Sequence, residues 1–502
     1  MPEQLPPLIT ELLAGHGFPH PAGNPELVET HASWLLLAGD FAYKIKKPVT
    51  LPFLDYGSLE KREVCCRAEL ALNRRLAADL YLDVVPIGGN AARPLVGALP
   101  AIEWAVRMHR FDEAGRLDRV AARGELRPED LSGLAATLCT FHAGAPAAAP
   151  GSRFGAPAQV LATARENFVE LRHLLAPADQ PLVEQLAAWS EAEFFRREAD
   201  FAARKLGGRI REGHGDLHLA NLVLIDGRVI PFDCIEFSDD FRWNDPVSEI
   251  AFIWIDLLDH GKPGLAAWLL NAWLETSGDF GAIAVLRYYA VYRAVVRAKI
   301  AALRARQEQS AATATDIAAA RGYLDLAWKI AAPSAPTLGI TCGLSGSGKT
   351  TASTARLLDA TRADAGRLIR LRSDVERKRL FGLAPLAASG SALDQGIYTQ
   401  EANARTYSAL LSLARSALAA GWPVIVDATF LRCAERDSFA ALATDLGVGF
   451  SILFTEVAPE ELRRRLLARS GDASEATVDV LARQLEWFEP ISTAEQSAVV
   501  RS

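Results

Sequence analysis

Runs of apolar residues in the first 110 positions are typical of a small antiparallel sheet. The first two runs are separated by Gly39-Asp40, a dipeptide that favours a tight hairpin turn. A helical stretch follows, from about residue 59 to residue 80. We therefore expect a small lobe made of a sheet and one helix. Its predicted strands cover residues 33–38, 41–45, 84–87 and 104–108.

Two longer segments, residues 128–205 and 246–330, are rich in Ala and Leu and place apolar side chains at helical spacing. They predict a mostly helical second lobe with a short stranded segment between them. Pro333 and Pro336 then break the last helix just before an apolar strand that begins at Leu338. The predicted domains are 1–332, with a small lobe to about residue 110, and 338–502, joined by a linker at 333–337.

Composition narrows the class of protein. The chain has 502 residues, of which 50% are hydrophobic and 23% are charged, so it can build sizeable cores. Its net charge of -7 argues against a protein that mainly coats nucleic acid, because such binding depends on excess Lys and Arg. The six cysteines show no C-x-x-C spacing, and neither a targeting signal nor a long apolar span is evident. We expect a cytoplasmic protein with reduced thiols and no membrane partner.

A candidate catalytic loop lies in the short stranded segment, at His214-Gly215-Asp216-Leu217-His218-Leu219-Ala220-Asn221. Phosphoryl transfer from ATP requires a carboxylate that orients the attacking hydroxyl, together with oxygen ligands for a metal ion. Asp216 and Asn221 are five residues apart, which is the separation of the base and the metal-binding amide in kinase catalytic loops. Asp233 follows at the end of an apolar strand and is predicted to be the metal carboxylate. The alternative is an ordinary turn.

This motif resembles that of the aminoglycoside phosphotransferase family, also called choline-kinase-like, over roughly residues 30–330. The resemblance implies a bilobal protein-kinase-like fold, with Asp216 as the catalytic base and Asn221 and Asp233 as Mg²⁺ ligands. It also implies that Lys44 contacts the phosphates of ATP and that Glu69, on the following helix, pairs with that lysine.

The sequence departs from the kinase pattern before Lys44, where no Gly-x-Gly-x-x-Gly occurs. Lys46 competes with Lys44 for the phosphate-binding role by strand register alone. Two further polar residues are given structural roles. Asp245 is expected to anchor the loop, and His218 to order it.

A second nucleotide motif begins after the predicted strand 337–342. Gly343 to Thr350 match G-x-x-x-x-G-K-[ST] and precede a helix-forming run, which is the context of a P-loop. Lys349 is expected to reach the β and γ phosphates, and Thr350 is expected to bind Mg²⁺. Asp427 ends a buried strand and is expected to hold the water shell of the metal. The alternative for Asp427 is an ordinary residue at the end of a strand. The predicted phosphate-binding backbone is that of Gly343, Ser345, Gly346, Ser347 and Gly348.

Beside the P-loop, a candidate acceptor site follows the apolar strand 368–371. Ser373 and Glu376 match an S-x-x-E capping box, which predicts a helix start. Asp374 and Arg377 then share one helix face, where they could accept a hydroxyl proton and bind an anionic group of the same substrate. A surface ion pair is the alternative.

Arg465 and Arg469 lie one helical turn apart and precede a short polar stretch. They are predicted to form a mobile lid that brings arginine to the transferring phosphate; the alternative is an amphipathic helix with a solvated basic face. The half from 338 to 500 resembles P-loop kinases of the polynucleotide-kinase, gluconate-kinase and zeta-toxin type. That resemblance implies Asp374 as the substrate base, Arg377 as a substrate anchor, and the two arginines as lid residues.

The fold class expected is thus α+β and α/β: a bilobal kinase-like domain followed by a P-loop domain with a parallel sheet between helices. The expected function is an ATP-dependent kinase with two nucleotide sites, using ATP, or GTP as the alternative, and Mg²⁺. Each site is expected to phosphorylate a hydroxyl of a small-molecule or nucleotide-like acceptor. Two other readings stay open: that one half is an ATP-binding regulatory module, and that the chain phosphorylates nucleic-acid ends. The oligomeric state does not follow from the sequence.

Overall fold

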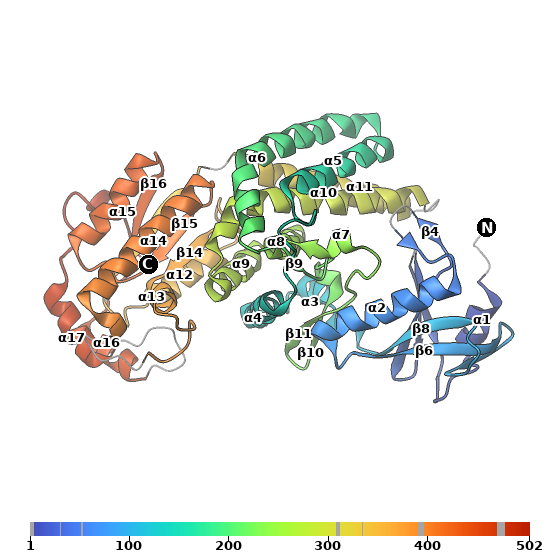
Figure 1. Cartoon of the computed structure of the whole chain (residues 1–502). Coiled ribbons are helices and arrows are strands. Elements are labelled where there is room, and N and C mark those ends of the chain that lie inside the picture. Colours follow the sequence, from blue (N-terminus) through green and yellow to red (C-terminus); the bar gives the residue numbers. More distant parts are fainter. Residues whose placement is uncertain are drawn as a thin grey trace. The chain divides into compact units, whose positions relative to one another are not determined.

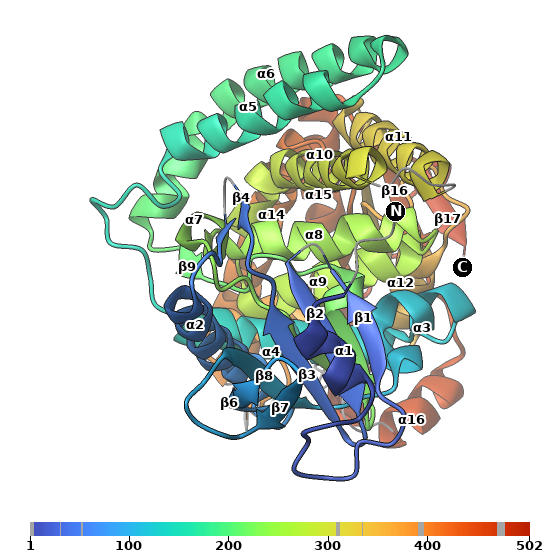
Figure 2. The ribbon, with the colours of Figure 1, turned by 90° about the vertical axis from the view of Figure 1, so that its right-hand side faces the viewer.

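The computed structural model describes residues 5–30, 32–51, 54–307, 312–333, 335–389, 396–468 and 477–501. The chain forms two compact units. The first comprises Met1–Leu126, Thr140–Gln159 and Ala203–Glu249, and the second comprises Arg127–Cys139, Val160–Ala202 and Ile250–Ser502. Figure 1 shows the ribbon coloured along the sequence, and Figure 2 shows it turned by a quarter turn.

The first unit contains the predicted sheet, which is antiparallel and has six strands; β1, β7 and helix α1 are additional to the four strands and one helix that the pattern predicts. Helix α2 packs against β6 and β8 on one side of the sheet, and α1 packs against β2 and β7. The turn between β2 and β3 requires a glycine, because Gly39 has φ +58° and a Cβ there would lie 2.5 Å from the Pro21 carbonyl oxygen. The strands, in sheet order, are β1 (Glu26–Glu29), β2 (Ser33–Ala38), β3 (Phe41–Lys46), β8 (Glu103–His109), β6 (Tyr81–Asn90) and β7 (Arg93–Val96), and the helices are α1 (Pro7–Leu13) and α2 (Leu59–Ala77).

A short hairpin in the first unit carries the motif around Asp216. Strands β10 (Leu222–Ile225) and β11 (Arg228–Pro231) pair antiparallel, with Leu222 opposite Pro231. The residues just before β10 and just after β11 therefore meet at the open end of the hairpin. The other small elements of this unit are β4 (Thr50–Leu51), β5 (Leu54–Asp55), α3 (Leu117–Arg123), β9 (Arg211–Glu212), α7 (Asp239–Arg242) and β12 (Trp243–Asn244).

Long helices make up the middle of the chain, as the Ala/Leu-rich pattern predicts. Helices α5 and α6 lie side by side in both views, and α10 packs along α11 (Figures 1 and 2). None of the helices in the described residues combines the length and the apolar character needed to span a bilayer. The helices are α4 (Pro128–Gly144), α5 (Pro157–Leu174), α6 (Gln180–Leu206), α8 (Pro246–Asp259), α9 (Pro263–Ser277), α10 (Ile283–Gln307) and α11 (Ala312–Ala331).

The C-terminal part of the second unit is built on a five-stranded parallel sheet. Its order, β14-β15-β13-β16-β17, places the strand that precedes the P-loop in the centre. The strands are β13 (Thr337–Cys342), β14 (Ile369–Arg372), β15 (Val424–Asp427), β16 (Gly449–Phe454) and β17 (Val499–Arg501). The helices are α12 (Lys349–Leu358), α13 (Ser373–Leu380), α14 (Gln400–Ala419), α15 (Cys433–Asp445), α16 (Pro459–Leu467) and α17 (Val478–Trp487).

Helix α9 shares a hydrophobic core with this sheet. Ala267 of α9 is buried together with Leu357, Leu368, Ile425 and Leu453. The Trp254 indole of α8 also donates to the carbonyl oxygen of Gly366 at 2.9 Å. Residues upstream of the proline-rich segment thus pack with the P-loop part of the chain. The domain limits 1–332 and 338–502 stay a prediction from the sequence.

Candidate active sites

The loop that carries the first motif folds so that Asn221 lies against Asp216. The Asn221 side-chain amide donates to the backbone carbonyl oxygen of Asp216 at 2.9 Å and to its carboxylate at 3.1 Å. Gly215 permits the turn, because its φ is +92° and a Cβ there would lie 2.9 Å from the Phe241 carbonyl oxygen. The predicted base and the predicted metal-binding amide are therefore direct neighbours.

The hairpin brings Asp233 to the same place. The carbonyl oxygen of Asn221 accepts the Phe232 N–H at 3.0 Å, so Asp233 directly follows a residue bonded to Asn221. Asp233 itself has φ +61°, a left-handed conformation that is uncommon for a residue with a Cβ. Its N–H is held by the Tyr81 hydroxyl at 3.1 Å. Such local strain is often found at functional sites.

His214 is completely buried beneath this loop and bonds within it. Its Nδ1 accepts the Asp216 N–H at 3.3 Å, and its Nε2 lies 2.9 Å from the Phe232 carbonyl oxygen, to which it donates. Burial lowers the pKa of His214 from its ordinary value and favours this neutral form. The ring therefore ties the catalytic loop to the strand that leads to Asp233.

Glu249, on helix α8, holds the loop backbone. Its Oε1 accepts the N–H groups of His214 and Gly215, both at 2.6 Å, and its Oε2 lies 2.7 Å from Nε2 of His142. Burial alone would raise the pKa of Glu249. The hydrogen bond and the charge of His142, together with the hydrogen bonds from the backbone, outweigh this effect and lower the pKa to about 2. Gly213 is constrained to glycine, because a Cβ there would lie 2.4 Å from Glu249 Oε1. Sequence reasoning missed Glu249 and His142.

Lys44 links the small lobe to the metal-binding motif. Its ammonium group donates to Glu69 at 2.8 Å and to Asp233 at 2.5 Å. Burial alone would lower the pKa of Lys44, but the Asp233 and Glu69 carboxylates raise it well above its ordinary value, so the side chain stays charged. The structure thus places the predicted phosphate-binding lysine, its predicted partner and the predicted metal carboxylate in one chain of contacts.

Lys46 occupies a separate, fully buried position beside it. It donates to the second oxygen of Glu69 at 2.7 Å and to the Tyr56 hydroxyl at 3.2 Å, and it also pairs with Glu236. Burial opposes the charge of Glu69, but Lys44 and Lys46 outweigh it and lower the pKa of Glu69 to about 2. One carboxylate therefore fixes both lysines. Only Lys44 also reaches Asp233 among the contacts of the described residues.

The two residues given structural roles lie near the loop. Asp245 forms a buried ion pair with Arg204, at 2.7 Å for one of its oxygens, and accepts the Val247 N–H at 3.1 Å, so it fixes the start of α8. His218 Nε2 lies 3.4 Å from the Asp216 carboxylate. Glu249, and not Asp245, makes the direct bonds to the backbone of the loop.

The second candidate site is built on the P-loop, which runs from the end of β13 into α12. Gly343, Gly346 and Gly348 all have positive φ, at +153°, +84° and +94°, and a Cβ on Gly343 would lie 2.5 Å from Thr455 atoms.

Side chains also hold the P-loop in place. The Lys349 ammonium donates to the Leu344 carbonyl oxygen at 2.8 Å and so lies across the loop. Ser347 and Thr455 join their hydroxyls at 2.7 Å, and the Ser345 N–H donates to the Gln484 side chain at 2.8 Å.

The predicted metal ligands lie beside this loop. Asp427, the last residue of β15, is only 5% exposed, and Ser353 of α12 donates to its carboxylate at 3.1 Å. Thr350 stands in the first turn of the same helix. Hydroxyl and carboxylate oxygens are ligands that Mg²⁺ accepts, so this donor set fits the ion.

A cavity of about 1210 Å³ gathers the predicted residues of the second site. Its wall includes the P-loop, the start of α13, the end of β15, and parts of α14, α16 and α17. The sequence-predicted residues among its lining are Ser345, Gly346, Gly348, Lys349, Thr350, Asp374, Arg377, Asp427 and Arg465. The cavity is also lined by aromatic and polar residues that the sequence did not indicate: Tyr398, Asn403, Tyr407, Arg432, Glu435, Gln484 and Trp487.

Helix α13 starts where the sequence predicts, but without the predicted capping box. Ser373 is its first residue, Arg372 precedes it with no side-chain cap, and Glu376 pairs with Arg379 one turn later. Arg377 is 7% exposed and donates to the Ile397 carbonyl oxygen at 3.2 Å and to Asn403 at 2.9 Å. It is therefore a buried member of the cavity wall rather than a member of a surface ion pair.

Arg465 of α16 reaches the P-loop. Its guanidinium lies 3.4 Å from the Gly346 carbonyl oxygen and also donates to Glu461 at 2.7 Å. Arg469 and the polar stretch after it lie outside the described residues. Of the two predicted lid residues, only Arg465 is among the described residues, and it lines the cavity.

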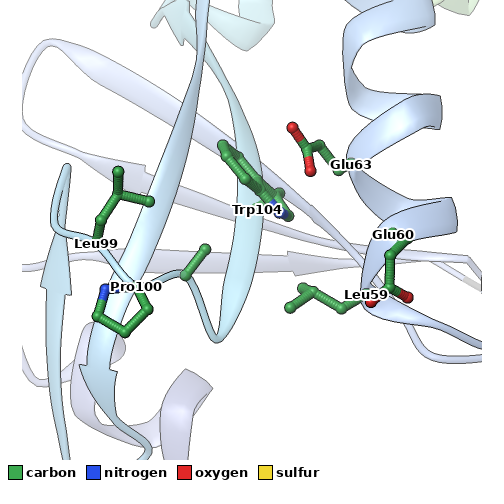
Figure 3. Close-up of a pocket in the computed structure, with 7 residues that line it drawn as sticks. Leu59, Glu60, Glu63, Leu99, Pro100 and Trp104 are labelled. Carbon is green, nitrogen blue, oxygen red and sulfur yellow. The ribbon is translucent and has the colours of Figure 1, made fainter.

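A second, shallower hollow lies on the small lobe, with a volume of about 650 Å³ (Figure 3). Leu59, Leu99, Pro100 and Trp104 give it a largely apolar lining, to which Glu60 and Glu63 also belong. It contains none of the residues predicted for either phosphate site.

The comparisons with known proteins cover both halves. Residues 338–491 match the family model described as AAA domain. Over 483 residues the chain is 30% identical to the uncharacterized proteins Rv2004c of Mycobacterium tuberculosis and Mb2027c of Mycobacterium bovis, covering 93% of this chain and 92% of theirs.

Two solved structures resemble separate parts of the chain. A choline/ethanolamine kinase family protein from Mesorhizobium loti matches 64% of this chain and 99% of its own, at 11% identity and a TM-score of 0.39. A gluconokinase from Sinorhizobium meliloti matches 34% of this chain and 82% of its own, at 21% identity and a TM-score of 0.24. The predicted fold class is confirmed in its mixed α and β character and in its C-terminal P-loop domain, which is built on a parallel sheet and matches the AAA domain model.

Proposed function

The chain belongs to the family of these mycobacterial proteins, and we propose that it is a phosphotransferase with two nucleotide sites, each phosphorylating a hydroxyl of a small-molecule or nucleotide-like acceptor. The observation that carries the proposal is the cavity that unites the P-loop, Asp427, Asp374 and Arg465. Phosphate-binding, metal-binding and proton-accepting groups are there held in one enclosure of a size suited to a nucleotide and a small acceptor. The cofactors proposed are ATP and Mg²⁺.

At the P-loop site, the loop amides and Lys349 bind the β and γ phosphates. Thr350 would bind Mg²⁺ and Asp427 would hold its water shell, and the ion would supply charge neutralisation. Asp374 orients the acceptor hydroxyl and takes its proton as the oxygen attacks the γ phosphorus, and the bond to the ADP oxygen breaks. Arg465, already at the loop, stabilises the charge on the transferred group.

At the first site, Asp216 has the same role toward a second acceptor hydroxyl. Lys44, fixed by Glu69, binds the phosphates, and the oxygens of Asn221 and Asp233 fit a Mg²⁺ ion. The contact between Lys44 and Asp233 brings the phosphate-binding and metal-binding groups together. His214 and Glu249 keep the loop in the conformation that presents Asp216.

The test uses two single variants, Asp216→Asn and Asp374→Asn, and labelled ATP with a metabolite extract. Each variant is expected to lose one set of labelled products and to keep the other, because each removes one base. Loss of both sets in either variant, or of neither in both, contradicts two independent sites. The double variant serves as the background measurement.

The regulatory reading is favoured by one observation, the core that α9 shares with the parallel sheet. If the P-loop half only senses ATP, Lys349→Ala changes the rate at the first site without removing a product. If both halves are catalytic, it removes one set of products.

The nucleic-acid reading is weakened by the contacts of the arginines from 367 to 379. Arg370 and Arg372 form ion pairs with the Glu275 carboxylate. Arg379 donates to the backbone carbonyl oxygen of Glu275, and Arg367 donates to the backbone carbonyl oxygen of Lys329. These side chains are engaged within the protein. If the chain transfers no label from ATP to the ends of oligonucleotides, the nucleic-acid hypothesis is contradicted.

A further inference from the structure

Helix α9 contacts strand β14 and helix α13, and α13 carries Asp374 and Arg377 of the P-loop site. We infer that Asn271 and Glu275 of α9 are positioning residues of that site, acting through β14 and α13. The inference rests on the proposed function of the P-loop half. It places part of the machinery of this site upstream of the P-loop sequence itself.

Asn271 takes the place of a neighbouring strand at the edge of the parallel sheet. Strand β14 is an edge strand, and its outer side would otherwise leave backbone groups without strand partners. The Asn271 amide nitrogen donates to the Leu368 carbonyl oxygen at 2.8 Å, and its oxygen accepts the Arg370 N–H at 2.6 Å. The side chain is 1% exposed, so water does not compete for these bonds.

Glu275, one helical turn later, binds both ends of α13. Its carboxylate accepts from Arg370 at 3.0 Å and lies 3.6 Å from Arg372, the residue that precedes α13. Its backbone carbonyl oxygen accepts from Arg379, in the last turn of α13, at 2.6 Å. The helix turns that carry Asp374 and Arg377 lie between these two attachments.

The support beneath this contact is apolar. Ala267 of α9 belongs to the core formed with Leu357, Leu368 and Ile425, and Trp268 lies under the Arg370 guanidinium at 5.7 Å from its ring centre. A catalytic group displaced by about 1 Å can lose on the order of a hundredfold in rate. A rigid support for α13 is therefore a requirement of the reaction and not only of stability.

The experiment uses the full-length chain with Asp216→Asn, which silences the first site. Glu275→Gln keeps the backbone bond to Arg379 and removes the charge, Asn271→Ala removes both strand-like bonds, and Glu275→Asp is the conservative variant. Thr276→Ala, on an exposed position of the same helix, is the matched control. The measurements are hydrolysis of MgATP, the Kd for MgADP, and hydrogen exchange of peptides covering 343–350 and 368–380.

We expect Glu275→Gln and Asn271→Ala to lower hydrolysis about tenfold, with Glu275→Asp in between and the Kd for MgADP within about twofold of the parent. Exchange is expected to rise in 368–380 and to stay unchanged in 343–350. Unchanged exchange in 368–380, or an equal rise in both peptides with a parallel loss of MgADP binding, overturns the inference. If the parent hydrolyses no MgATP, hydrogen exchange together with MgADP binding decides the positioning role, while loss of label transfer to the metabolite extract is the separate result that contradicts the proposed function.

Discussion

Glu249 holds the backbone of His214, whose N–H group donates to the Glu249 carboxylate at 2.6 Å. The same oxygen accepts the Gly215 N–H, and the other oxygen contacts His142. The loop that presents Asp216 is thereby attached to helix α8 through the carboxylate of Glu249, a residue that is only 1% exposed. Two consecutive amides directed at one buried carboxylate leave the loop little freedom to change conformation.

Replacing Glu249 should therefore affect both stability and the first site. Glu249→Ala leaves two amides without their acceptor, and we expect the free energy of unfolding to fall by about 2–4 kcal/mol. Glu249→Gln retains an acceptor oxygen but loses the charge, so it should cost up to about 3 kcal/mol, the size of the contribution of the charge itself. Urea unfolding measures both values. A change of similar size in Glu184→Gln, an exposed partner of Arg172, would argue against a specific role of the buried bonds.

Acid should weaken the same attachment. The pKa of Glu249 is lowered from 4.5 to about 2 in the folded chain, so its contribution to stability is complete above about pH 4.5. It is lost as the pH falls from there toward about 2, and it amounts to about 3 kcal/mol. Urea midpoints between pH 7 and pH 3 should fall less steeply for Glu249→Gln than for the parent. Parallel curves would contradict the assignment.

The two lysines of β3 show what the sequence could and could not establish. A strand alternates its faces every residue, so Lys44 and Lys46 lie on the same face, and periodicity alone does not rank them. The structure separates them by their partners, because Lys44 contacts Asp233 while Lys46 contacts Glu236 and Tyr56. The spacing of Asp216 and Asn221 needed no such information, because one local loop brings both together.

Long-range contacts account for the residues that were missed. Glu249 and His142 are far apart in the chain and carry no local motif, and Asn271 looks like an ordinary polar residue on an apolar helix. The capping box at Ser373 shows the opposite error. A local pattern predicted the helix start correctly, but Arg372 and not Ser373 is the N-cap, so Glu376 lies one position beyond the one that a reciprocal cap requires.

Exchanging each lysine for methionine should separate catalysis from stability. Lys44→Met removes the phosphate-binding charge while Glu69 keeps Lys46, so first-site turnover should fall on the order of 10²–10³-fold. Lys46→Met leaves Glu69 and Glu236 buried with one fewer positive partner, and it should lower the free energy of unfolding by about 3–5 kcal/mol. Lys61→Met, at an exposed position, is the control. Loss of turnover in Lys46→Met without loss of stability would reverse the two roles.

The metal requirement of the P-loop site should depend on the pair Ser353 and Asp427. Asp427→Asn removes the charge that supports Mg²⁺, so ADP affinity with Mg²⁺ should fall about tenfold or more, while affinity without the ion stays near that of the parent. Ser353→Ala removes the hydroxyl that lies 3.1 Å from this carboxylate and also 3.1 Å from the Thr350 carbonyl oxygen in its own helix, and we expect a smaller rise, about threefold, in the Mg²⁺ concentration needed.

Calorimetric titration of ADP at several Mg²⁺ concentrations measures both effects. Ser438→Ala is the matched control, because that exposed hydroxyl also bonds within its own helix, at 2.8 Å from the Ala434 carbonyl oxygen. An equal loss of ADP affinity with and without Mg²⁺ in Asp427→Asn would mean that the residue supports the loop itself. In that case Thr350 would be the only residue still assigned to the ion at this site.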